Sequence, residues 1–220
     1  MTRLEEIKQQ IDKITSELIS YSLCSEQNYP TISNNVISFG NASGNLSIAL
    51  KNVSYSDIYE ELNKRKAFNI KMLDGALILM LYEFEKSRKL DKINKHNLAF
   101  FPSPNLEAFQ NEPEIYEEDE IYADILYKNI VPFPIRFDFD PLNHQIIEHP
   151  KSHLTLGQYK NCRIPVSAPV TPFEFIEFIL RNFYNTAYHK YSNKFKFSKQ
   201  YFPKTIEPEE CQIPHLRLHN

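Results

Sequence analysis

The sequence predicts an α+β fold: a largely antiparallel sheet, an amphipathic helix at the N-terminus and a C-terminal helix packed on the sheet. Apolar residues recur at helical spacing near the N-terminus, strand-length apolar runs fill the middle, and a helix-start signal follows at Thr171. With 220 residues, 42% of them hydrophobic, the chain is long enough for one substantial core. We therefore expect residues 1–220 to form a single α+β domain.

The N-terminal helix is expected within residues 1–25. Thr2 and Glu5 have the spacing of a capping box, which predicts that the helix begins at about Arg3. Apolar residues then recur at steps of three and four, and they are Leu4, Ile7, Ile11, Ile14, Leu18 and Tyr21. Such a stripe is typical of a helix docked on its own domain. It also fits a seam for a partner helix, so a protein partner bound through this helix is the alternative.

Apolar runs of strand length predict the sheet. Two short runs within residues 31–50, NVISFG and NLSIALK, flank the turn-rich segment GNASGN. Residues 55–66 have the apolar spacing of a short helix. Residues 76–84 follow an Asp-Gly turn signal and form a continuous apolar run, which predicts a strand buried on both faces. The stretch NLAFFPSP predicts a further strand, ended by its prolines.

The C-terminal helix has a strong start signal. Thr171, Pro172 and Glu174 supply an N-cap, a proline at the first helical position and a capping-box acid. The apolar residues that follow share one face and predict packing on the sheet; they are Ile176, Ile179, Leu180, Phe183 and Ala187.

Polar side chains are concentrated in residues 135–157, a segment that otherwise predicts two strands. Strand alternation in IRFDFD places Arg136, Asp138 and Asp140 on the face opposite the apolar residues. In SHLTLGQY the same alternation turns His153 away from the core. Antiparallel pairing of these strands would make the two polar faces coincide. The predicted catalytic residues are Arg136, Asp138, His149 and His153, and the predicted substrate contacts nearby are Asp140, His144 and Thr155.

A guanidinium, a carboxylate and two imidazoles suit phosphodiester cleavage without a metal or other cofactor. One histidine can take the proton of a ribose 2′-hydroxyl, the second can protonate the leaving oxygen, and Arg136 can stabilise the phosphorane charge. Asp138 can orient a histidine and fix its tautomer. The alternative is a divalent metal such as Mn²⁺ or Zn²⁺, for which the candidate ligands are Asp138, Asp140, His149 and His153. A solvated hairpin face with weak ion pairs would carry the same residue types.

Two charged segments flank the strands. Residues 107–127 are acidic, which is typical of an exposed loop or a solvated helix face. Residues 184–220 begin with a basic, aromatic stretch in which Lys190, Lys194 and Lys196 are candidate phosphate contacts and the aromatic rings could stack on bases. An ordinary structural element whose aromatic side chains fill the core would have the same composition.

Composition and charge argue against several classes of protein. The net charge is −3 and the pI is about 6.2, so a globally cationic nucleic-acid surface is not expected. The three cysteines are far apart and contain no CxxC pair, which argues against a zinc knuckle or a disulfide framework. The N-terminus is too charged for a signal peptide, and the longest apolar run is too short for a bilayer. We expect a cytoplasmic protein that does not contact membranes.

The sequence resembles a bacterial family called domain of unknown function 2290. The resemblance rests on DGALILMLYEF, LAFFPSPN, RFDFD, HPKSHLTLG and CRIPVSAPVTPFEFIEFILRNFY, in that order. The family name implies no activity. An Arg-x-Asp strand, a His-Pro-x-x-His segment and a following helix are also similar to the TumE-like ribonuclease toxins. That likeness implies that Arg136, Asp138, His149 and His153 match the toxin motif, although this chain lacks the adjacent histidines and has a larger N-terminal part.

Two classes of function follow from these features. The first is an endoribonuclease or related phosphodiesterase, acting as an effector or toxin in a bacterial defence or toxin–antitoxin system. The second is a non-enzymatic subunit of a multi-protein defence complex, or a module that senses a nucleotide without turnover. The Arg/Asp/His group and the basic segment favour the first class, and the N-terminal stripe and the acidic segment favour the second.

Overall fold

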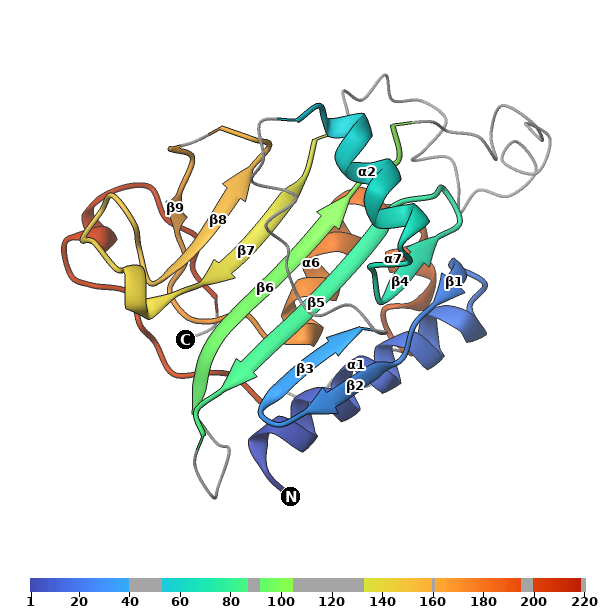
Figure 1. Ribbon diagram of the computed structural model, residues 1–220, viewed down its shortest axis with the longest axis horizontal. Helices are drawn as coiled ribbons and strands as arrows, with labels where there is room; N and C mark the ends of the chain where they lie inside the picture. The colour runs from blue at the N-terminus through green and yellow to red at the C-terminus, as the bar shows by residue number, and fades with distance from the viewer. Residues whose placement is uncertain (40–52, 87–91, 105–132, 160, 195–199, 219–220) are drawn as a thin grey trace.

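The computed structural model describes residues 1–39, 53–86, 92–104, 133–159, 161–194 and 200–218. Within these residues nine strands form one sheet (Figure 1). The helices of these ranges are α1 (Arg3–Ser20), α2 (Tyr55–Lys64), α6 (Pro172–Phe183) and α7 (Asn185–Tyr191), with short 3₁₀ turns η3 (Pro141–Asn143) and η4 (Glu210–Gln212). The strands are β1 (Cys24–Gln27), β2 (Pro30–Ser33), β3 (Val36–Phe39), β4 (Ile70–Met72), β5 (Leu77–Phe84), β6 (Ile93–Phe101), β7 (Ile135–Phe139), β8 (Ser152–Leu156) and β9 (Ile164–Pro165).

The sheet confirms the predicted α+β class. Its main order is β1-β4-β5-β6-β7-β8-β9, β3 also pairs with β5, and β2 pairs with β3. All of these pairings are antiparallel. The predicted strand NVISFG is β3, the run at 76–84 is the central strand β5, and residues 55–66 contain α2. The run NLSIALK and the acidic segment 107–127 lie outside the described residues.

Helices cover the two faces of the sheet unequally. In Figure 1, α1, α6 and α7 lie behind the strands, and α2 lies in front of the upper ends of β5 and β6. The larger apolar cluster includes residues of α1, α6 and the facing side of β4 to β8. The smaller one joins α2 to alternate residues of β5 and β6. The α2 cluster also includes Phe39 of β3, and neither cluster includes a residue from the front faces of β7 and β8.

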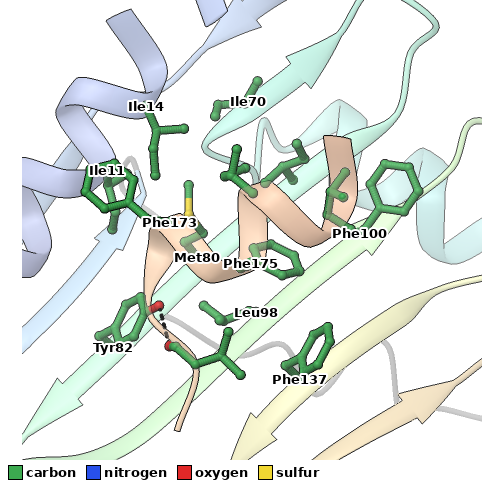
Figure 2. Packing of buried hydrophobic residues seen from close by; sticks show 14 of the residues in the cluster. Ile11, Ile14, Ile70, Met80, Tyr82, Leu98, Phe100, Phe137, Phe173 and Phe175 are labelled. Carbon is green, nitrogen blue, oxygen red and sulfur yellow. Dashed lines mark hydrogen bonds between the residues drawn. The ribbon is translucent and has the colours of Figure 1, made fainter. Parts of the chain in front are cut away.

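The stripe of α1 is buried within the chain. Leu4, Ile7, Ile11, Ile14 and Leu18 are each at most 2% exposed. Ile11 and Ile14 point toward Phe173 and Met80 in the close view of Figure 2. Docking of this helix on its own domain is therefore confirmed. A partner bound through the same stripe would require α1 to leave the sheet.

The core under α6 is built from aromatic side chains. Phe137 of β7 contacts Phe175 and Phe178 edge-on, with ring centroids 6.0 and 5.1 Å apart. Tyr82 is fully buried, and its hydroxyl donates to the Val170 carbonyl at 2.9 Å, which fixes the chain just before α6 (Figure 2). This packing explains why α6 lies along the back of the central strands.

The predicted capping box at the start of α6 is present and buried. The Glu174 N–H donates to Thr171 Oγ1 at 3.3 Å, and a Glu174 carboxylate oxygen accepts from the Thr171 N–H at 2.8 Å. Thr171→Ala removes the capping oxygen and should cost about 1–2 kcal/mol of unfolding free energy. Urea denaturation checks this, with Thr171→Ser as the control that keeps the oxygen. An alanine variant as stable as the serine variant would contradict a stabilising role for the cap.

The basic, aromatic segment begins with a helix of its own, and the predicted C-terminal helix therefore does not run on to Ala187. Residues Asn185–Tyr191 form helix α7, separated from α6 by Tyr184, whose φ of −132° and ψ of 50° break the helix. Tyr184 and Ala187 are buried, and Tyr191 stacks on Tyr21 at the end of α1, with ring centroids 4.4 Å apart. Aromatic residues of this segment therefore join the helices together. None of the described helices has both the length and the apolar character that a membrane span needs.

Candidate active site

Two rows of side chains cross the front face of β6, β7 and β8. In one row Ala99 pairs with Arg136 and Arg136 pairs with Thr155. In the next row Asn97 pairs with Asp138 and Asp138 pairs with His153. The predicted antiparallel pairing is confirmed, and so is the coincidence of the polar faces. The register places Arg136, Asp138 and His153 together on one patch, because paired side chains lie on the same face of a sheet. These rows and His149 are called the polar cluster below.

His153 is nearly covered, and its tautomer follows from its neighbours. The side chain is 4% exposed, and Nδ1 lies 2.9 Å from the Pro150 carbonyl oxygen. A carbonyl can only accept, so Nδ1 carries the proton, and Nε2 of the neutral ring has a free lone pair. Nε2 lies 3.9 Å from Asp138 Oδ2. Burial lowers the pKa of His153, although the Asp138 carboxylate opposes this, so the neutral ring is favoured.

His149 is the second imidazole of the cluster. It ends a tight turn in which the Gln145 and His149 backbones exchange two hydrogen bonds, of 3.0 and 2.7 Å. Ile147 within the turn has a φ of +67°, which is rare for a β-branched residue. The His149 ring meets the His153 ring edge-on, with centroids 4.9 Å apart. Its Nδ1 is buried and has no hydrogen-bond partner among the described residues. The turn thus holds two imidazoles in contact.

Asn97 is a member of the cluster that the sequence did not indicate. Its side-chain amide donates to Asp138 Oδ1 at 2.6 Å. This bond holds one carboxylate oxygen and leaves Oδ2 as the oxygen nearer to His153. Alternation along NLAFF could have placed Asn97 on a face opposite its apolar neighbours. Its partner on β7 could not be predicted, because a long stretch of sequence separates the two strands.

The guanidinium of Arg136 has no hydrogen bond or ion pair to its environment within the described ranges. The side chain is half-buried, and its Nε is covered without a partner. An unpaired covered donor is costly, and an anionic ligand would supply the missing acceptor. Arg136 is therefore the cluster residue most readily assigned to anion binding.

Asp140, one of the alternative metal ligands, is already engaged by an ammonium group and an amide. Asp140 lies 3.4 Å from the Lys95 ammonium and accepts from the Asn143 amide at 2.8 Å. Partial burial raises the pKa of Asp140, but the Asn143 and Lys95 contacts outweigh it and keep the pKa below its ordinary value. Among the residues that are described, no group of three or more His, Cys, Asp or Glu side chains has an arrangement that could hold a metal ion.

Several predicted substrate contacts lie apart from the cluster. His144 faces the C-terminal segment, with Nε2 3.4 Å from the Glu210 carboxylate. The Nζ atoms of Lys190, in α7, and of Lys194, three residues after it, each lie 5.6 Å from the Tyr191 ring centre, and α7 lies behind the sheet (Figure 1). Lys196 lies outside the described residues. Thr155 is in the cluster but is only 4% exposed. The candidate phosphate contacts Lys190 and Lys194 therefore belong to the region around α7, while the cluster lies on the front face of β6 to β8.

The fold and the cluster define an α+β domain with an Arg/Asp/His group on one face of an antiparallel sheet. The model of a family of uncharacterized conserved proteins (DUF2290) matches residues 23–218, and the chain belongs to this family. Comparisons with curated proteins and with solved structures gave no match. The likeness to TumE-like toxins is thus not confirmed.

Proposed function

We propose that the protein is a metal-independent endoribonuclease, an effector or toxin of a bacterial defence or toxin–antitoxin system that acts in the cytoplasm on RNA. The observation that carries this proposal is the contact between two imidazoles beside an unpaired guanidinium and a carboxylate. Acid–base cleavage of RNA needs a proton acceptor, a proton donor and a cation near the phosphate. The polar cluster contains one candidate for each role.

The tautomer of His153 supports its role as the base. Its neutral Nε2 takes the proton of the ribose 2′-hydroxyl while the 2′-oxygen forms a bond to phosphorus. The bond from phosphorus to the 5′-oxygen breaks, and that oxygen takes a proton from protonated His149. Arg136 stabilises the negative charge of the phosphorane. Asp138 acts as a positioning residue, because the imidazolium formed at His153 lies beside its carboxylate.

The burial of His153 favours a second candidate, a module that binds a nucleotide without turnover. At 4% exposure the ring offers little surface to a substrate, whereas the half-buried His149 and Arg136 are more accessible. Such a module would bind a phosphate through Arg136 and need no proton transfer. The two candidates differ in whether a bond of the ligand is broken.

A cleavage assay separates the two candidates. Purified protein is incubated with end-labelled single-stranded RNA in EDTA, with single-stranded DNA as a substrate that lacks the attacking hydroxyl. We expect RNA cleavage with 2′,3′-cyclic phosphate ends and no DNA cleavage. His149→Gln and Arg136→Gln should each lower the rate about 10²-fold or more, because each removes an acid–base or electrostatic contribution.

His189→Gln is the matched control, since His189 is an exposed histidine of α7 behind the sheet. It should cleave like the unaltered protein, and circular dichroism should show that all variants are folded. Equal cleavage by every variant would identify a contaminating nuclease and reject the proposal. Cleavage that requires a divalent metal would reject the metal-independent mechanism.

A further inference from the structure

A second arginine, Arg163, immediately precedes β9, which is the second strand along the sheet from the Arg136 strand β7. Strands β8 and β9 pair His153 with Pro165 and Leu154 with Ile164, and continuing this register one residue past the start of β9 brings Arg163 opposite Thr155. The next contact along this register is also present, because the Leu156 N–H donates to Cys162 Sγ at 3.5 Å. Arg163 therefore extends the row of Arg136 and Thr155.

Strand alternation gives the direction of the Arg163 side chain. Ile164 packs on the core behind the sheet, so its neighbour Arg163 faces the front. Consistent with this, Arg163 is one of the charges that lower the pKa of His153, after burial as the main cause. With strands about 4.8 Å apart, the Cα atoms of Arg136 and Arg163 are about 10 Å apart, with Thr155 between them. Two arginine side chains can converge across that distance.

The charges around this row favour an anion. Arg163 is half-buried, and the described residues give neither it nor Arg136 an acidic partner. The nearest carboxylate of the neighbouring row, Asp138, already accepts from Asn97. His153 is held neutral by burial. The two rows together thus have two positive charges against one engaged carboxylate, and guanidinium forks match the geometry of phosphate oxygens.

We propose that Arg136 and Arg163 form a clamp for one phosphate group, held in front of Thr155 and beside His153. This inference rests on the proposed function, because it makes the clamped phosphate the one whose ester bond is cleaved. The bound phosphate group can belong to an RNA backbone or to a free nucleotide, because both offer the same phosphate oxygens to the two arginines. Arg163 becomes a phosphate-binding residue that the sequence alone did not indicate.

Binding is measured apart from cleavage, by fluorescence anisotropy of a labelled 2′-O-methylated RNA oligomer that has no attacking hydroxyl. Arg163→Gln and Arg136→Gln should each weaken binding about tenfold or more, as expected for losing a charge-assisted contact. Each should also reduce the slope of log K against log salt by about 0.7. Arg163→Lys should recover part of the affinity. Arg181→Gln, an exposed arginine of α6 on the other side of the sheet, is the control and should bind normally.

A nucleoside monophosphate, titrated by calorimetry against the same variants, distinguishes the two sources of phosphate. Loss of monophosphate binding in both arginine variants, without any RNA binding by the unaltered protein, supports the clamp but rejects the ribonuclease. Unchanged affinities of Arg163→Gln for both probes would overturn the clamp. Cleavage of RNA by the unaltered protein would leave the ribonuclease proposal standing in that case.

Discussion

Ile11→Asp is expected to unfold the protein. Ile11 is on the face of α1 that packs on the core, and its side chain is fully buried. Helix α1 packs on both the sheet and α6. A carboxylate at this position would lose its hydration without gaining a partner, and the packing of the isoleucine would also be lost. We expect a loss of about 4 kcal/mol or more, which is comparable to the whole stability of many domains. Circular dichroism and urea denaturation measure the effect.

Gln9→Asp is the matched control for this substitution. Gln9 is exposed on the other side of the same helix, so the same charge should leave stability nearly unchanged. The comparison also tests the partner interpretation of the stripe. A folded Ile11→Asp variant with native stability would mean that the stripe is not held in the core and is free for another protein.

The stability of the protein is expected to fall as the pH falls below 6.5, with His96 as a main cause. His96 is fully buried, and Nε2 accepts from the Val170 N–H at 2.9 Å, so the ring is held neutral. Burial lowers the pKa of His96 to about 3 from its ordinary value of 6.5. Between these two pKa values the histidine is protonated in the unfolded chain and neutral in the folded chain. The stabilisation is complete above pH 6.5 and is lost progressively as the pH falls toward 3.

His96→Gln tests this contribution, because glutamine can still accept from Val170 and does not titrate. The loss assigned to His96 is about 2 kcal/mol at pH 5 relative to pH 7. The unfolding free energy of both proteins is measured by urea denaturation across pH 4.5 to 7. Between pH 7 and pH 5 it should fall by about 2 kcal/mol less in the variant than in the unaltered protein. The exposed His189→Gln variant should keep the slope of the unaltered protein. Parallel profiles of His96→Gln and the unaltered protein would contradict a neutral, buried His96.

Much of the fold could be predicted because local signals agree with the tertiary structure. The capping boxes at Thr2 and Thr171 mark the starts of α1 and α6, and the stripe from Leu4 to Leu18 is the buried face. The break at Tyr184 that makes α7 a separate helix was not predicted, because the seven residues of α7 carry no start signal and depend on packing. The stacking partner of α7, Tyr21, is far away in the sequence.

Within the candidate site, prediction succeeded where the residues belong to one hairpin. Alternation and antiparallel pairing of β7 with β8 were enough to bring Asp138 and His153 together. Asn97 and Arg163 were missed, because their places depend on the register of β6 and β9 against this hairpin. The place of Lys190 and Lys194 around α7 could not be predicted for a related reason, since composition does not reveal on which side of a sheet a helix packs.

The alternation of β7 has a consequence for how this protein can change over time. Phe137 points into the aromatic core, while its neighbours Arg136 and Asp138 point away from it. Substitutions on the polar side leave the aromatic contacts intact, so the chemistry proposed for this face can be lost or exchanged at little cost to the architecture. A lineage of this fold could therefore pass between enzyme and binding protein through a few substitutions on one strand.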